Sequence, residues 1–320
     1  MMSQPSYISS SEAKRYVLIV AATAMLLSAL AMAISFLAIH YRWVNWHFAQ
    51  LYEYQLGKLK GNAPIEVLLV GDSSLGNVID ARGWSERLKR PVVSVALTGV
   101  YGHAGSLNMM RRAVRHHKIA TIVVVQTIDS MTRDSNDQGL IHTAETLSDL
   151  RGLSPLGLFR ALATLDIVLH ALDTIVKGRP VIDPEIVKSD YVPQGRPLPE
   201  IRARPAPGGF APSQINRSNA DWLIEMAKFC RENNVQCVYA FGPISELFCE
   251  GSTAYLREVA QIVENSGLRL LSKEPVCIPW ERTGDATNHV APTWRNHYSN
   301  HYLSLIEPIL RYSERPSATP

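Results

Sequence analysis

An uncharged, strongly apolar segment near the N-terminus constrains this chain more than any other feature of its sequence. The segment runs from Val17 to Ile39 and has no Asp, Glu, Lys or Arg over about 23 positions, enough for a helix to cross the hydrocarbon core of a bilayer. A cleaved signal peptide is the alternative. However, the segment is longer than the apolar region of a signal peptide, and His40-Tyr41-Arg42-Trp43 after it is not a small-residue cleavage site. We therefore predict one transmembrane helix.

Basic residues on either side of the segment indicate its orientation. Lys14 and Arg15 precede it and Arg42 follows it, so the N-terminal side is only slightly more basic. The positive-inside rule then places the N-terminus in the cytoplasm and the rest of the chain outside, with a periplasmic domain if the protein belongs to a bacterial inner membrane. The expected parts are a cytoplasmic tail (1–15), the transmembrane helix (16–41), a stalk or linker (42–64) and an α/β domain (65–315).

Strand-like and helix-like segments alternate after the anchor. Apolar runs of strand length end at Val70, Leu97, Thr127 and Phe241, with helical patterns between them, which predicts a parallel sheet covered by helices on both faces. An insertion from about 134 to 216 interrupts this alternation. Within it, 156–176 has helical spacing and either packs on the core or docks on a membrane partner. The net charge of +3 gives no sign of nucleic-acid binding.

The first predicted strand ends in Gly71-Asp72-Ser73-Ser74, which presents a hydroxyl at the carboxyl edge of the sheet. These residue types also favour ordinary turns, so the motif needs partners elsewhere in the chain. A serine becomes nucleophilic when a histidine, oriented by a carboxylate, takes its proton. Asp285 and His289, in loop-like sequence before the last helix, fit these two roles. We predict that Ser73, His289 and Asp285 form a catalytic triad.

These motifs resemble, in the same order, those of the SGNH/GDSL hydrolase superfamily: VGDSS with Ser73, VSVALTG ending in Gly99, VVVQTID third, and Asp285 with His289 before the final helix. The resemblance covers about 65–130 and 220–312. It implies an SGNH-like (flavodoxin-like) three-layer α/β fold with a parallel sheet, and an oxyanion hole that includes Ser73 and Gly99. It implies no cofactor and no metal.

Two positions depart from the family's pattern. The third block has Ile128 where the family has an oxyanion asparagine, and three residues instead of two separate Asp285 from His289. One oxyanion donor is worth about 10²- to 10³-fold in rate. We therefore expect weak activity or a donor from elsewhere, such as the Gln126 side chain or the backbone amides alone. Asn77 and Arg295 are candidate substrate-binding residues, although a solvated side chain for Asn77 and a surface salt bridge for Arg295 are the commoner roles.

The anchor and the altered third block narrow the resemblance to accessory proteins of cell-envelope acylation, such as those of alginate O-acetylation and of D-alanyl transfer to teichoic acids. Such proteins work beside a membrane-bound O-acyltransferase. The resemblance therefore implies transfer of an acyl group, acetyl in the first instance, from an acyl-serine to an envelope polysaccharide. An esterase with the same triad, and a catalytically weak scaffold that binds polysaccharide or the acyltransferase, are the alternatives.

The four cysteines all lie in the last third of the chain. An oxidising compartment permits disulfides, and none of the spacings is that of a metal site. We expect a disulfide between Cys249 and Cys277, which are in loop-like sequence. Cys230 and Cys237 fall on a helix and a strand, where they are expected as buried apolar side chains.

Overall fold

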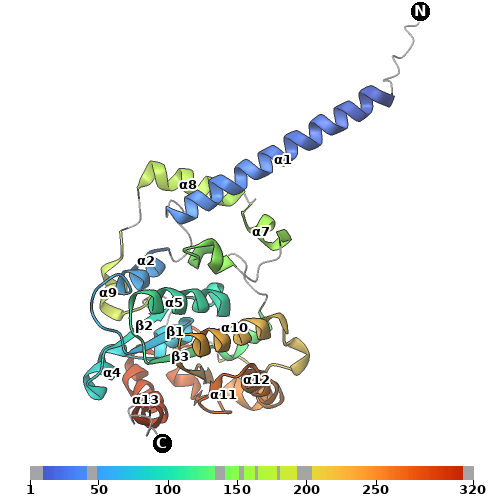
Figure 1. Cartoon of the computed structure of the whole chain (residues 1–320). Coiled ribbons are helices and arrows are strands. Elements are labelled where there is room, and N and C mark those ends of the chain that lie inside the picture. Colours follow the sequence, from blue (N-terminus) through green and yellow to red (C-terminus); the bar gives the residue numbers. More distant parts are fainter. Residues whose placement is uncertain are drawn as a thin grey trace, which may run out of the picture. The chain divides into compact units, whose positions relative to one another are not determined.

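The computed structural model describes residues 10–41, 49–133, 141–150, 155–162, 165–178, 181–192 and 204–312. The chain divides into two compact units (Figure 1). The first unit comprises Met1–His47 and Arg151–Pro180, and the second comprises Phe48–Leu150 and Val181–Pro320.

The first unit is built on helix α1 (Ser10–His40), which is long and apolar enough to cross a membrane (Figure 1). This unit also contains the helices α7 (Pro155–Leu162) and α8 (Leu165–Lys177). Ala38 of α1 forms a small buried cluster with Ile167 and Ala171 of α8. The segment expected as one helix over 156–176 is thus two helices, and they pack with α1. The expectation was packing on the α/β core or docking on a membrane partner; the contact that the structure describes is with α1 of the same unit.

The second unit is a mixed α/β structure around a five-stranded parallel sheet, as the alternating sequence pattern predicted. The strand order is β2-β1-β3-β4-β6. Strands β1 and β3 lie inside the sheet and are buried along their whole length, which explains their apolar sequences. The strands are β1 (Val67–Gly71), β2 (Val92–Ala96), β3 (Thr121–Gln126), β4 (Gln236–Phe241) and β6 (Arg269–Leu270), with a separate pair, β5 (Ile244–Ser245) and β7 (Cys277–Ile278).

Helices cover both faces of the sheet. On one face, α3 (Ser73–Val78), α4 (Ala81–Leu88) and α13 (Arg295–Tyr312) share a core with alternate side chains of β1 and β3, including Val67, Leu69 and Val123. On the other face lie α5 (Gly102–His116) and α10 (Ser218–Glu232), followed by α12 (Thr253–Ser266) (Figure 1). Shorter helices are α2 (Ala49–Lys58), α9 (Pro184–Ser189) and α11 (Glu246–Cys249).

Helix α2 lies within the segment expected as a stalk, yet it belongs to the second unit. Its Leu51 is buried in the same cluster as β1, and Leu56 and Leu59 are buried as well. Lys58 Nζ donates to the carbonyl of Ser94 at 2.6 Å. The apolar residues that suggested a continuing helix are therefore core residues, and the globular unit starts earlier than residue 65.

Two disulfides use all four cysteines. The expected bond joins Cys249 at the end of α11 to Cys277 of β7. A second bond joins Cys230 to Cys237, so the expectation of two separate apolar side chains is wrong. The turn from α10 into β4 brings their Cα atoms to 6.1 Å, within the usual range for a disulfide.

Candidate active site

Three of the predicted site residues follow three neighbouring strands. Ser73 comes after β1, Gly99 after β2, and Gln126 is the last residue of β3. The chain passes from β1 to β2 on one side and then to β3 on the other, so the strand order reverses at β1. Ligand sites of open α/β sheets lie at the carboxyl ends of the strands beside such a reversal. The fold thus brings these three residues to the edge where chemistry is expected.

Asp72 fixes the turn that presents Ser73. Its Oδ1 accepts hydrogen bonds from Ser74 N (2.9 Å) and Ser74 Oγ (2.6 Å), and its Oδ2 accepts one from Thr127 N (3.0 Å). Burial raises the pKa of Asp72, while these hydrogen bonds favour its ionised form. A Cβ at Gly71 would overlap the carbonyl oxygen of Val125, so this position needs glycine. Ser73 is consequently held as the first residue of α3, with a half-buried side chain.

Asp285 and His289 form the predicted pair. The distance from His289 Nδ1 to Asp285 Oδ1 is 2.6 Å, and both side chains are largely buried. The loop that carries both residues is tight, because Gly284 N donates to His289 O at 2.6 Å. The three intervening residues are therefore compatible with the pair. A carboxylate that accepts the Nδ1 hydrogen leaves Nε2 as the basic nitrogen of the ring.

Hydrogen bonds connect the histidine loop to the turn that carries Ser73. Asn288 Nδ2 donates to Thr127 Oγ1 at 3.0 Å, and the amide of the same Thr127 donates to Asp72. The described residues show no hydrogen bond between Ser73 Oγ and His289, and this bond is often long in an unliganded site. Asn288 and Thr127 had no predicted role, although their positions beside His289 and after β3 were available signals.

Ile128 and Gln126 do not provide the side-chain donor that the resemblance implies for an oxyanion hole. Ile128, at the position of the implied asparagine, is buried. Gln126 Nε2 donates to Ser106 Oγ at 2.9 Å within the core, so this amide group already has an acceptor. The proposed use of Gln126 as a donor therefore conflicts with the structure. The backbone amides of Ser73 and Gly99 are the predicted donors that are left.

Asn77 and Arg295 make hydrogen bonds inside the protein. Asn77 Nδ2 donates to Ser73 O, one turn earlier in α3, at 2.8 Å. Arg295 donates to three carbonyls, those of Gly76 (3.0 Å), Ile79 (2.7 Å) and Ser189 (2.7 Å). Arg295 thus stabilises the C-terminal end of α3 and joins it to the end of α9. These contacts give both side chains a structural role instead of the expected substrate-binding role.

Tyr191, which belongs to the insertion, packs against α3. Its Oη donates to the carbonyl of Leu97 at 2.9 Å, and its ring packs so closely that a Cβ at Gly76 would overlap it. Burial raises the pKa of Tyr191, and the charges of Asp72 and Asp285 raise it further. The insertion therefore contributes a wall close to both carboxylates, which the sequence pattern did not indicate.

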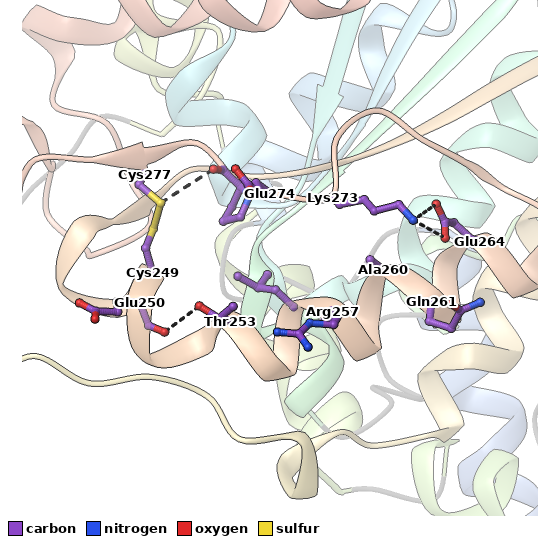
Figure 2. A pocket seen from close by; sticks show the side chains of 12 residues that line it. Cys249, Glu250, Thr253, Arg257, Ala260, Gln261, Glu264, Lys273, Glu274 and Cys277 are labelled. Carbon is purple, nitrogen blue, oxygen red and sulfur yellow. Dashed lines mark hydrogen bonds and ion pairs between the residues drawn. A yellow bond between two sulfur atoms is a disulfide. The ribbon is translucent and has the colours of Figure 1, made fainter.

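A separate cavity of about 600 Å³ lies between α12 and residues 273–277 (Figure 2). The Cys249–Cys277 disulfide closes one end, and an ion pair between Lys273 and Glu264 (3.1 Å) crosses the other. Its lining contains no serine and no histidine. The cavity is therefore distinct in its residues from the Ser73 site and has no catalytic constellation of its own.

The described part of the chain contains no group of three or more His, Cys, Asp or Glu side chains placed to hold a metal ion. The chain matches no protein-family model and no curated protein.

Proposed function

We propose that this chain is a membrane-anchored, SGNH-like acyltransferase that carries an acyl group, acetyl in the first instance, on Ser73. The observation that supports this most is the 2.6 Å pair of His289 and Asp285, in a loop that is hydrogen-bonded to the turn presenting Ser73. The strand order β2-β1-β3-β4-β6 is consistent with the flavodoxin-like arrangement of that superfamily.

The reaction follows from the roles of three side chains. His289 Nε2 takes the proton of Ser73 Oγ while the oxygen attacks the carbonyl carbon of the acyl donor. The tetrahedral intermediate collapses when the donor's leaving group departs with that proton, and an ester remains on Ser73. His289 then takes a proton from an acceptor hydroxyl, whose oxygen attacks the ester carbonyl. Ser73 leaves with a proton from His289, and the acceptor carries the acyl group.

The proposed acceptor is a hydroxyl of an envelope or exported polysaccharide, and the proposed donor partner is a membrane-bound O-acyltransferase. Helix α1, which is long and apolar enough to span a membrane, supports this arrangement because it would hold the site near such a partner. The proposal includes a bacterial inner-membrane location with a cytoplasmic N-terminus and a periplasmic domain. An esterase differs only in that water replaces the polysaccharide.

A non-catalytic scaffold is the second candidate, and a specific observation favours it. The side chain at the family's asparagine position is the buried Ile128, which has no hydrogen-bond donor. Such a protein would bind polysaccharide or the acyltransferase without turnover. Hydrolysis of a simple ester, dependent on Ser73, would exclude this candidate.

The direct test compares Ser73→Ala with Ser304→Ala in the full chain, purified in detergent, with p-nitrophenyl acetate as donor. Ser304 is a suitable control because it is exposed on α13 and its hydroxyl donates only to the carbonyl of His301. We expect Ser73→Ala to abolish turnover and Ser304→Ala to retain it. Equal turnover by Ser73→Ala and the parent chain would refute the proposal. Adding oligosaccharide acceptors then separates a transferase, which yields acylated sugar, from an esterase, which yields only acetate.

A further inference from the structure

Arg133 lies against the glycine of the proposed oxyanion hole. It follows the 3₁₀ helix Ile128–Thr132, which continues from β3. A Cβ at Gly99 would overlap Arg133 Nη1, so the guanidinium group fills space that only glycine leaves open. Arg133 thus extends from the segment after β3, where Ile128 replaces the asparagine that the resemblance implies, to Gly99 after β2.

One side of the guanidinium group is fixed and the other is available. Arg133 Nη2 and Nε bond to Asp129 Oδ2 at 2.9 Å and 3.3 Å, and the backbone oxygen of Arg133 accepts from Asn219 Nδ2 at 2.8 Å. Nη1 has no hydrogen-bond partner among the described residues, and about a third of the side chain (36%) is exposed. The ion pair therefore positions an unpaired N–H donor next to Gly99.

The positive charge also acts on the turn that presents Ser73. Arg133 lowers the pKa of Asp72, against the larger effect of burial, and it lowers the pKa of His103. Arg133, Gly99 and His103 line one small recess at the ends of the strands. Arg133 is thus the cation of the described structure that faces this recess.

We propose that Arg133 replaces the missing asparagine as the third oxyanion donor, which deepens the proposed function and rests on it. When Ser73 Oγ bonds to the acyl carbon, the carbonyl π electrons move onto the oxygen. Nη1 then donates to that oxygen beside the backbone amides of Ser73 and Gly99. Arg133 keeps its proton throughout, and the electron pair re-forms the carbonyl when the leaving group departs.

The test measures kcat and KM for p-nitrophenyl acetate with the full chain, comparing Arg133→Met and Arg133→Lys with a control, Arg217→Met. Arg217 is a suitable control because it also forms an ion pair, with Glu258, but is well exposed. A donor used only in the transition state changes kcat. We expect Arg133→Met to lower kcat by about 10²-fold with KM nearly unchanged, and Arg133→Lys to lower it less. The control should leave both constants unchanged.

The outcomes separate this inference from the proposed function. If Ser73→Ala abolishes turnover but Arg133→Met leaves kcat unchanged, the role of Arg133 is wrong and the function stands. A rise in KM alone also refutes this role and assigns Arg133 to binding of an anionic substrate group. If turnover does not depend on Ser73, both proposals fail. Thermal unfolding of Arg133→Met separates this role from misfolding, because loss of the donor alone lowers kcat with an unfolding temperature close to that of the parent, whereas a loss of kcat together with the folded state would refute a specific role of the Nη1 donor.

The first unit has an independent feature on α8, whose described side chains form three sectors. Ile167 and Ala171 are buried against Ala38 of α1. Asp173 and Lys177 form an ion pair at 2.7 Å on a second sector. The third sector is apolar and exposed, with exposed fractions of 53% to 82%, and consists of Leu169, Leu172, Ile175 and Val176.

Helix α1 also has exposed apolar side chains close in sequence to its contact with α8. Leu37, next to the contact residue Ala38, is exposed, and so is Ile34 one turn earlier. A helix with separate apolar and charged sectors is suited to the boundary between lipid and water. We infer that α8 lies in this boundary layer of the bilayer, with Leu172 and Val176 in contact with acyl chains and Lys177 toward the headgroups.

A depth measurement tests this position in the full chain, reconstituted into phosphatidylcholine and phosphatidylglycerol vesicles. A fluorescent amino acid is placed at Val176, or at the adjacent Lys177 as the matched control, and lipids with brominated acyl chains serve as quenchers. We expect strong quenching at Val176 and weak quenching at Lys177. Weak quenching at both positions would overturn the inference and leave this sector to a protein partner, which the vesicles lack.

Discussion

His103 should make the folded protein less stable as the pH falls from 7 to 4. It lies on α5, almost completely buried, and its Nε2 is 3.2 Å from Tyr239 Oη. Burial, with a smaller contribution from Arg133, lowers the pKa of His103 from 6.5 to about 4.

The direction and size of this change in stability follow from the protonation of His103 in the folded chain and in the unfolded chain. Between pH 6.5 and 4 the unfolded chain binds a proton at His103 and the folded chain does not. The free energy of unfolding therefore falls as the pH falls from 6.5 to 4. Above pH 6.5, the pKa of His103 in the unfolded chain, neutral His103 contributes its full share of the stability. A shift of this size corresponds to about 3 kcal/mol.

The measurement is urea unfolding of the full chain in detergent at pH 7 and pH 4, for the parent and for His103→Gln. Glutamine is neutral at both values and retains a hydrogen-bonding group for Tyr239. We expect the parent to lose about 3 kcal/mol more than the variant between the two pH values. Other groups, such as His142 with its pKa lowered to about 3, titrate in both proteins. Identical pH dependence in both would refute the reasoning.

Three further substitutions have definite expected outcomes. Gly76→Ala should lower the free energy of unfolding by about 2 kcal/mol, because the new methyl group would overlap the Tyr191 ring, whereas Gly57→Ala in α2 meets no atom within 4 Å and should raise it by about 1 kcal/mol. Thermal unfolding measures both, and equal effects would contradict the packing of Tyr191. Asp285→Asn should reduce kcat for p-nitrophenyl acetate by roughly 10⁴-fold, because an amide favours the wrong tautomer of His289. A decrease of less than about 10-fold would contradict the orienting role of Asp285.

The sequence was informative wherever one segment carried its own signal. Strands β1, β3 and β4 are largely apolar runs, so burial on both faces could be predicted from them. The edge strand β6 has only two residues, Arg269 and Leu270, and is too short to produce a periodic pattern. The helical spacing in α2 and α8 was recognised, but spacing does not specify which surface an apolar face contacts. This is why both helices pack differently from expectation.

The same limit applies to the site. Asp285 and His289 are close in sequence, so their pairing could be predicted from local chain geometry. Tyr191 and Arg133 were missed because each reaches the site from another segment, and only the folded chain shows that contact. Gln126 looked available as a donor because its partner, Ser106, lies on α5. Such contacts depend on how the helices pack on the sheet, which no single segment encodes.

The most direct test of acyl transfer through Ser73 is detection of an acyl group on its hydroxyl. The full chain is incubated with p-nitrophenyl acetate, quenched in acid and mapped by peptide mass spectrometry, with His289→Ala as the control. We expect an acetyl ester on the peptide at Ser73 in the parent and a strongly reduced amount in the control. An unmodified Ser73 in folded protein that still turns over the ester would show that Ser73 does not carry the acyl group.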